Sequence, residues 1–247
     1  MLIDTHCHLD DSVYDEDREK IIETFEGIII NCGTRLDTSQ SSIELSKKYK
    51  NIYPTAGLHP HYAQEVDAKF YEEFNRLLDN DKVVAIGECG LDFYRNLSDR
   101  KIQEEVFRNL IRIANKRSLP LIIHSRDAMD ETLRIIKEEG VKKGVLHSFS
   151  GTKEDVAKVL SLGLYISITG VITIKKARLK EIVQYIPKDR IMFETDSPYL
   201  TPEPCRGKRN SPHYVRYVIE GYAHSCGIKF DEASEINYNN AKVFFGL

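Results

Sequence analysis

The sequence has no apolar stretch long enough to cross a bilayer, no low-complexity run, and no linker rich in glycine, serine or proline. The first absence argues against a helical membrane protein, and the last leaves no obvious point at which the chain would divide into domains. The chain has 247 residues, of which 41% are hydrophobic, so it can bury a sizeable core. We therefore expect one soluble globular domain over residues 1–247.

Cysteines are few and widely spaced. The five cysteines form no CxxC pair, which argues against a disulfide framework and favours reduced thiols in the cytoplasm. The first ten residues also lack the basic and apolar regions of a signal peptide. Cleavage there would remove His6 and His8, so we expect the mature protein to begin at or near Met1.

An excess of positive charge is absent as well. Lysine and arginine number 35 against 38 aspartates and glutamates, and the formal net charge is −3. The protein therefore has no overall positive field that would attract nucleic acid, and extended binding to a duplex is disfavoured. Any such contact must come from a local basic patch. No feature of the sequence indicates a membrane or an obligate protein partner.

The sequence does contain a regular alternation of short apolar runs and amphipathic segments. The runs are typical of buried strands, and the segments carry apolar residues at helical spacing. Strands are expected at the opening of the chain and over residues 28–33, 52–57, 83–87, 120–123, 144–146, 164–168 and 190–193. Helices are expected over residues 17–25, 38–49, 66–78, 99–116, 130–139, 152–162 and 176–186, from 211 onward, and over 231–244.

This alternation predicts an α/β fold. A β–α repeat requires parallel strands with right-handed crossovers. Eight such units in about 250 residues close most simply into a (β/α)8 barrel, the TIM barrel, as a single domain. An open doubly wound sheet is the alternative, but no glycine-rich phosphate-binding motif follows the first strand.

Residues of ligand type stand at the ends of five of these strands. The first strand runs out into two histidines one residue apart, which point the same way because strand side chains alternate. The complete set is His6, His8, Glu88, His124, His147 and Asp196. Each could instead be a helix cap or a hydrogen-bonded core residue. In a barrel, however, the carboxyl ends of the strands face one site, and so many ionisable groups there would be costly to desolvate without a cation.

Four histidines and two carboxylates are more ligands than one ion needs. We therefore expect two divalent metal ions about 3.5–4 Å apart, bridged by a carboxylate and a hydroxide. Glu88 is the expected bridge because its strand lies midway around the ring. One ion would take the two histidines of the first strand with Asp196, and the other would take His124 and His147. Imidazole with carboxylate suits Zn, Mn, Fe or Co, whereas Mg prefers oxygen. The residue types therefore do not fix the metal, and we carry Mg, Mn and Zn as candidates.

Several motifs resemble those of the TatD family of metal-dependent deoxyribonucleases, which belongs to the amidohydrolase-like barrels. They are DTHCHLD at 4–10, GLHPH at 57–61, GECGLDFY at 87–94, ETDSPYLTP at 194–202 and RGKRN at 206–210. They occur in the family's order over essentially the whole chain, and the family's metal positions fall on the six residues above. Cys7 and Cys89 stand where other residues are often found. Neither change alters a ligand, but two thiols beside the site leave open tighter zinc binding or oxidative sensitivity.

The resemblance implies a hydrolase that cuts DNA phosphodiester bonds, often as a 3′-to-5′ exonuclease on single strands. The bridging hydroxide would attack phosphorus in line. Asp196 could orient that water and accept its proton, while Glu88 holds both ions. His59, in the loop after the third strand, is placed to contact the phosphate or the leaving oxygen, unless it only packs on Pro60.

Substrate contacts are expected from two loops. Arg206, Lys208 and Arg209 would supply a local basic patch after the eighth strand, where barrel phosphate sites form. Tyr94 and Arg95, after the fourth strand, could stack on a base or grip a second phosphate of single-stranded DNA. A solvated loop is the alternative for Lys208, and packing within the loop is the alternative for Tyr94.

Other functions stay open. A hydrolase of the same barrel could act on a cyclic amide, a lactone or an ester, although many of these binuclear enzymes use a carbamylated lysine where this chain has Glu88. Within the family, removal of D-amino acids from tRNA, the reaction of a D-aminoacyl-tRNA deacylase, is an ester hydrolysis that the same ions could perform. A non-catalytic scaffold would be expected to lack a ligand, and none is missing.

Overall fold

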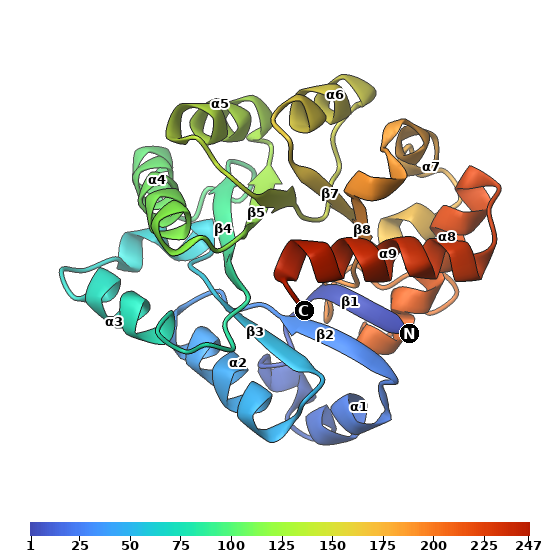
Figure 1. Cartoon of the computed structure of the whole chain (residues 1–247), viewed down its shortest axis with the longest axis horizontal. Helices are drawn as coiled ribbons and strands as arrows, with labels where there is room; N and C mark the ends of the chain where they lie inside the picture. The colour runs from blue at the N-terminus through green and yellow to red at the C-terminus, as the bar shows by residue number, and fades with distance from the viewer.

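The computed structural model describes residues 1–247, and its eight strands pair in chain order, each parallel to the next. The strands are β1 (Leu2–Cys7), β2 (Gly27–Asn31), β3 (Ile52–Ala56), β4 (Ala85–Asp92), β5 (Leu121–Arg126), β6 (Gly144–Leu146), β7 (Tyr165–Ile168) and β8 (Ile191–Phe193). The helices are α1 (Arg18–Thr24), α2 (Leu36–Lys48), α3 (Phe70–Leu77), α4 (Arg100–Arg117), α5 (Met129–Glu139), α6 (Lys153–Ser161), α7 (Leu179–Ile182), α8 (Val215–Cys226) and α9 (Phe230–Phe245). Helices surround the ring of strands (Figure 1), which confirms the predicted (β/α)8 barrel. None of the helices is both long and apolar enough to span a bilayer.

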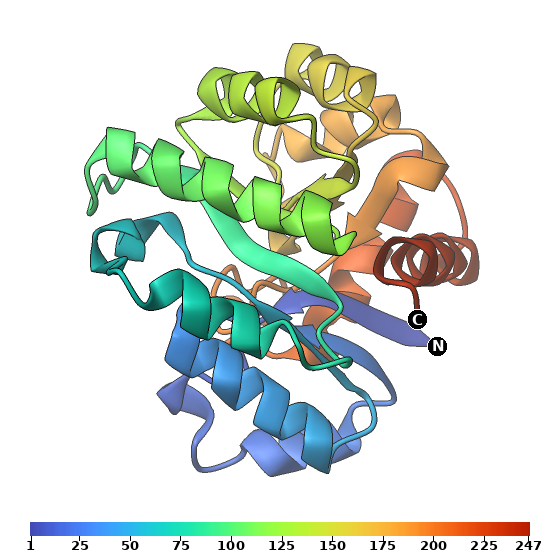
Figure 2. The same cartoon turned by 60° about the vertical axis from the view of Figure 1, so that its left-hand side comes forward.

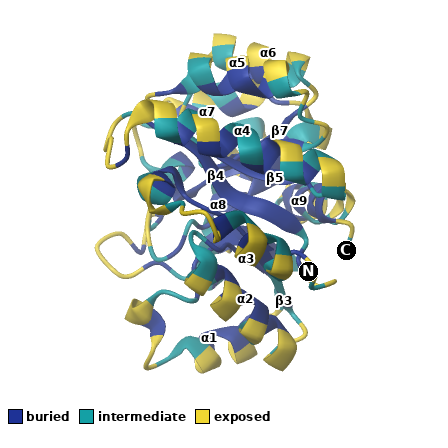
Figure 3. Ribbon diagram, turned by 90° about the vertical axis from the view of Figure 1, so that its left-hand side faces the viewer, coloured by how far each residue is buried: buried dark blue, intermediate teal, exposed yellow.

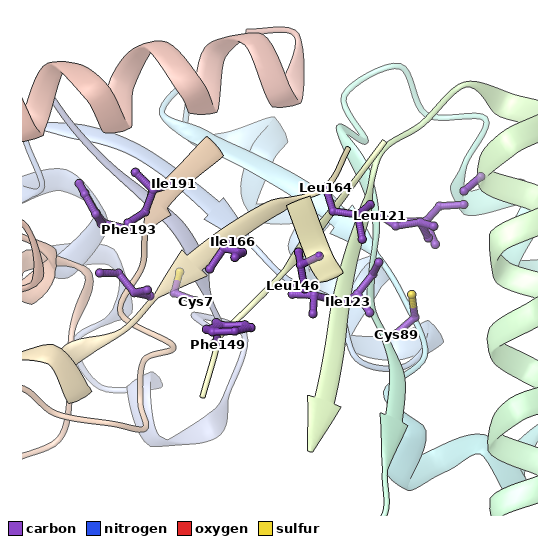
Figure 4. Close-up of a cluster of buried hydrophobic side chains, with 14 of the residues drawn as sticks. Cys7, Cys89, Leu121, Ile123, Leu146, Phe149, Leu164, Ile166, Ile191 and Phe193 are labelled. Carbon is purple, nitrogen blue, oxygen red and sulfur yellow. The ribbon is translucent and has the colours of Figure 1, made fainter. Parts of the chain in front are cut away.

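Buried apolar side chains form two clusters, one on each side of the sheet. The larger cluster lies between strands and helices and includes Leu121 and Ile123 of β5 (Figure 4). The smaller lies inside the ring and joins Ile122 of the same strand to Ala241 and Phe244 of α9. Helix α9 therefore closes the amino-terminal end of the barrel, near both ends of the chain (Figures 1 and 2). The surrounding helices bury their inner faces and expose their outer ones (Figure 3).

The ring closes between β1 and β8 with the help of a side chain. At the carboxyl end, the backbone amides of His8 and Asp196 donate hydrogen bonds across the junction. Nearer the amino end, the buried side chain of Asn237 in α9 takes the place of a backbone ladder. Its Nδ2 donates to the carbonyl of Ile3 at 2.8 Å, and its Oδ1 accepts from the amide of Phe193 at 2.8 Å. One amide side chain thus satisfies a buried acceptor on β1 and a buried donor on β8.

Register shifts interrupt two strands, one after Asp4 in β1 and one after Ile86 in β4. Such a bulge inserts an unpaired residue and so reverses which side chains face inward. Ile3 belongs to the cluster inside the ring, yet His6, three residues further on, also faces the interior. The shift in β4 turns Glu88 inward in the same way.

The largest departures from the sequence prediction are found in three elements. β4 continues to Asp92 instead of ending at 87, because residues 89–92 pair with β5. Helix α3 begins at Phe70 instead of 66, because the carboxylate of Asp67 accepts hydrogen bonds from the amides of Lys69 and Phe70, both at 2.9 Å, and so holds a turn in front of the helix. The helix expected over 176–186 is reduced to α7 and a 3-10 turn. That segment carries several neighbouring positive charges, which disfavour a continuous helix.

We predict that Asn237→Ala lowers the free energy of unfolding by about 2–4 kcal/mol, because it leaves a buried carbonyl and a buried amide without partners. Urea denaturation of both proteins measures the difference. Asn239→Ala, at an exposed position of the same helix, is the matched control and should change little. Equal stability of the two variants would show that the barrel junction does not depend on Asn237.

Candidate metal centre

Six side chains meet at the open, carboxyl end of the barrel. They are His6, His8, Glu88, His124, His147 and Asp196. His6, Glu88 and His124 lie within strands, whereas the other three follow their strands by one to three residues; the sequence prediction had placed each ligand where its strand stops. Only His124 and Asp196 are partly exposed, with 16% and 14% of their side chains accessible, so they mark the side that opens to solvent.

The carboxylate of Glu88 stands at the centre of this group. Its Oε1 lies 2.8 Å from His124 Nδ1 and 2.8 Å from His147 Nε2. Its Oε2 lies 3.4 Å from His6 Nε2 and 3.6 Å from His8 Nε2. The two oxygens of one carboxylate thus face two different pairs of histidines, which is the arrangement that a bridging ligand requires.

Asp196 lies beside the first of these pairs. Its Oδ1 is 3.7 Å from His6 Nε2 and 3.6 Å from His8 Nε2, and its backbone amide donates to the carbonyl of His6 at 2.9 Å. Asp196 also forms a group of possible metal-binding atoms with His6 and His147. The rings of those two histidines stack with centroids 4.2 Å apart, so the two predicted ion positions adjoin.

Polar groups behind the histidines set which ring nitrogen faces the site. His8 Nδ1 lies 2.9 Å from the carbonyl of Cys32 and must donate to it, which leaves the Nε2 lone pair directed at the centre. Behind His147, the buried carboxylate of Glu194 lies 3.4 Å from Nδ1 and is itself held by the hydroxyl of Ser167 at 2.6 Å. Such outer carboxylates orient metal-binding imidazoles. The sequence prediction gave Glu194 no role, although its position directly after β8, two residues before Asp196, was a usable signal.

A second supporting carboxylate, Asp92, was also not predicted. Its Oδ2 lies 3.3 Å from His124 Nε2 and 2.9 Å from His61 Nε2. Its Oδ1 accepts hydrogen bonds from the backbone amides of Tyr94 at 3.0 Å and Arg95 at 2.7 Å. Asp92 therefore orients one predicted metal ligand and also fixes the turn that carries two of the predicted substrate residues.

The buried carboxylates of this group need positive charge close to them. Burial opposes the charging of His8, but the carboxylates of Asp196 and Glu88 outweigh it and raise the pKa of His8 to about 9. Burial likewise tends to raise the pKa of Glu88, but the imidazoles of His147 and His59 hold it well below the usual value. The buried carboxylates are thus ionised and need cations beside them, either protons on the imidazoles or metal ions. The donor set of imidazole and carboxylate fits divalent metal ions.

His59 is placed as a hydrogen-bond donor. It caps the 3-10 helix Pro60–Glu65, and its Nδ1 accepts from the backbone amide of His61 at 3.2 Å. The hydrogen of the neutral ring is therefore on Nε2, which lies 3.4 Å from Glu88 Oε1. Burial lowers the pKa of His59 to about 4, so the ring is a neutral donor directed into the site.

The basic loop after β8 makes no hydrogen bond or ion pair with the six ligands. Arg209 is held by the carboxylate of Asp17 at 2.5 Å, and Arg206 lies 3.8 Å from Glu203. Lys208 is exposed and has no side-chain partner. The guanidinium of Arg209 thus ties the loop to the segment before α1, whereas Arg206 and Lys208 face solvent.

The two thiols next to ligands in the sequence point away from the site. The Sγ of Cys7 lies 3.7 Å from the carbonyl of Ile30, and that of Cys89 lies 3.6 Å from the carbonyl of Ile122. Both belong to the outer apolar cluster (Figure 4), and burial raises the pKa of both thiols. The structure thus places neither thiol beside the candidate site, because adjacent residues of a strand face opposite sides.

Comparison with known proteins gives a consistent result. The family model described as TatD related DNase matches residues 3–246. The chain is 41% identical, over the full length of both proteins, to an "uncharacterized metal-dependent hydrolase YabD" of Bacillus subtilis. It is 34% identical, again over the full length of both, to the "3′-5′ ssDNA/RNA exonuclease TatD" of Erwinia amylovora. The solved structure of YJJV, a TatD homologue of Escherichia coli, superposes with a TM-score of 0.93 at 26% identity and covers 100% of this chain and 98% of that one.

We predict that the metal affinity of the protein rises with pH. Because the pKa of His8 is raised to about 9, its proton must leave before Nε2 can bind a metal, so affinity should increase by up to about tenfold per pH unit from pH 7 toward pH 9. Calorimetric titration of the metal-free protein with Mn²⁺ measures this slope. His8→Ala should weaken binding and reduce the slope, but His124 and His147, whose pKa values are also raised, keep the affinity dependent on pH; the exposed His224→Ala should change neither the affinity nor the slope. The same affinity at both pH values would contradict the proton competition.

Proposed function

The chain belongs to the TatD family of metal-dependent hydrolases, and on that premise we propose that it hydrolyses DNA phosphodiester bonds, working from the 3′ ends of single strands. The observation that carries this proposal is the carboxylate of Glu88 between two pairs of histidines at the open end of the barrel. Support for the substrate comes from the relative named as a 3′-5′ ssDNA/RNA exonuclease.

The roles of the side chains follow from their positions. Two divalent ions held here would supply Lewis acidity, which makes a water molecule acidic and offsets the charge of a phosphate. Glu88 would hold them through its two oxygens, together with the histidines that each oxygen faces. Asp196 has its pKa lowered, so it is an ionised base at the solvent side that accepts the proton of the attacking water. His59 donates its Nε2 hydrogen to the phosphate or leaving oxygen as negative charge develops there.

The rim supplies the contacts that hold the strand. Arg206 and Lys208, which face solvent, are proposed to bind phosphates of the nucleic acid away from the reacting bond. Arg209 would keep their loop in place through its ion pair with Asp17. Such contacts neutralise backbone charge and carry no information about base sequence.

We predict that Glu88→Gln lowers kcat on a 3′-labelled single-stranded oligodeoxynucleotide by at least about 100-fold, because loss of an outer-shell partner of a metal site alone can cost that much. Glu235→Gln, at an exposed position of α9, is the matched control and should keep normal activity. Thermal melting of the metal-free variants checks that the fold persists. Normal activity of the Glu88→Gln variant would show that Glu88 is not needed for the reaction.

We further predict that Asp196→Asn lowers kcat by about 10²–10⁴-fold, the usual contribution of a positioned general base. The variant keeps the shape of the side chain but cannot accept a proton. Activity should be compared on single-stranded DNA, RNA, aminoacyl-tRNA and simple carboxylic esters, each with Mg²⁺, Mn²⁺ and Zn²⁺. If the protein hydrolyses a carboxylic ester but cleaves neither DNA nor RNA, the proposed nuclease function is wrong and esterase activity takes its place.

A further inference from the structure

Arg126 stands at the rim of the metal centre. It is the last residue of β5, two residues beyond His124. Ser125, between them, points outward, with its Oγ 3.0 Å from the Oγ1 of Thr132 in α5. Because side chains alternate along a strand, Arg126 leaves β5 on the same side as His124, about 6.6 Å further along the strand.

The guanidinium of Arg126 has no polar partner within the protein. Five arginines stack on aromatic rings: Arg35, Arg100, Arg126, Arg190 and Arg209. Four of them are also held by a carboxylate or an amide side chain. Arg126 makes neither kind of contact, so its N–H donors are all available. A guanidinium presents these donors in a planar fork that matches two oxygens of a phosphate.

An exposed tyrosine positions this guanidinium. The Cζ of Arg126 lies 4.1 Å from the ring centroid of Tyr94, a residue that is 60% exposed. The backbone amide of Phe93 donates to the carbonyl of Arg126 at 2.9 Å. The carboxylate of Asp92 binds the Tyr94 amide through one oxygen and faces His124 with the other. The position of the Arg126–Tyr94 pair relative to the metal centre is therefore set by the fold.

We propose that Arg126 and Tyr94 form a subsite for the nucleotide adjacent to the scissile phosphate of a single-stranded nucleic acid, an inference that rests on the function proposed above. Arg126 binds the neighbouring phosphate through two parallel hydrogen bonds. Tyr94 stacks on the base of that nucleotide with the ring face that Arg126 leaves free. The sequence analysis had named Arg95 as the residue that binds a second phosphate. We assign that contact to Arg126 instead.

The test compares a long and a minimal substrate. Arg126→Gln should raise KM for a single-stranded oligodeoxynucleotide about 10- to 100-fold, and should lower the slope of log KM against log salt by about 0.7, the value for one lost phosphate contact on a single strand. Hydrolysis of bis(p-nitrophenyl) phosphate, which has a single phosphate, should not change. Arg76→Gln, which removes a charge from an exposed ion pair on α3, is the matched control and should behave as wild type on both substrates.

A modified substrate isolates the phosphate itself. An oligonucleotide with an uncharged methylphosphonate next to the scissile phosphate should bind wild type as weakly as the normal substrate binds Arg126→Gln, and the two losses should not add. Tyr94→Leu should raise KM for the normal oligonucleotide and leave the small diester unaffected.

The possible outcomes separate this inference from the proposed function. If wild type degrades the oligonucleotide and Arg126→Gln matches Arg76→Gln, the subsite is wrong and the nuclease function stands. If Arg126→Gln impairs both substrates equally, Arg126 acts on the metal centre and the subsite is again wrong. If wild type hydrolyses small esters and no nucleic acid, both proposals fall.

Discussion

Charge balance at the mouth of the barrel is the constraint on which the rest of this structure depends. Two buried carboxyl groups show it by contrast. Asp4 has no imidazole partner, and burial raises its pKa to about 8, so it is largely neutral at pH 7. Glu88 is as deeply buried, but imidazoles surround it and keep it ionised. An ionised carboxylate in that position is tolerable only where cations can be placed on both of its sides, and the barrel provides that arrangement.

Backbone irregularities place the central carboxylate and the first pair of histidines. In a regular strand the side chains alternate inward and outward without a break. His6 and Glu88 would then face away from the interior that holds Ile3 and Ala85, three residues earlier in the same strands. The register shifts in β1 and β4 reverse the alternation at the level of the site. The close approach of β4 and β5 there also requires a glycine, because a Cβ at Gly90 would lie 2.0 Å from the carbonyl oxygen of His124. The register shifts thus lie in two of the strands that carry predicted ligands.

The sequence predicted the ring of strands and the ligand-type residues because both leave local signals. Apolar runs and helical periodicity mark the elements, and histidine or carboxylate residues at the ends of the runs are visible one by one. Contacts between distant segments leave no such signal. The link from Asn237 to both β1 and β8 joins residues 44 and 234 positions apart, and the extension of β4 to Asp92 depends on pairing with β5 instead of on composition. The same limit applies to Arg126, whose stacking on Tyr94 depends on how the end of β5 meets the turn after β4.

Asp92 connects the metal centre to the rim above it. Its Oδ2 contacts His124 and His61, and its Oδ1 holds the turn that carries Tyr94. A displacement of this carboxylate would therefore move a metal ligand and an exposed aromatic ring together. The barrel below is closed by α9 and packed around its own apolar cluster, whereas the candidate site occupies the carboxyl end, where barrels place their chemistry. Within that end, the orientation of His124 and the position of the turn that carries Tyr94 therefore depend on one side chain.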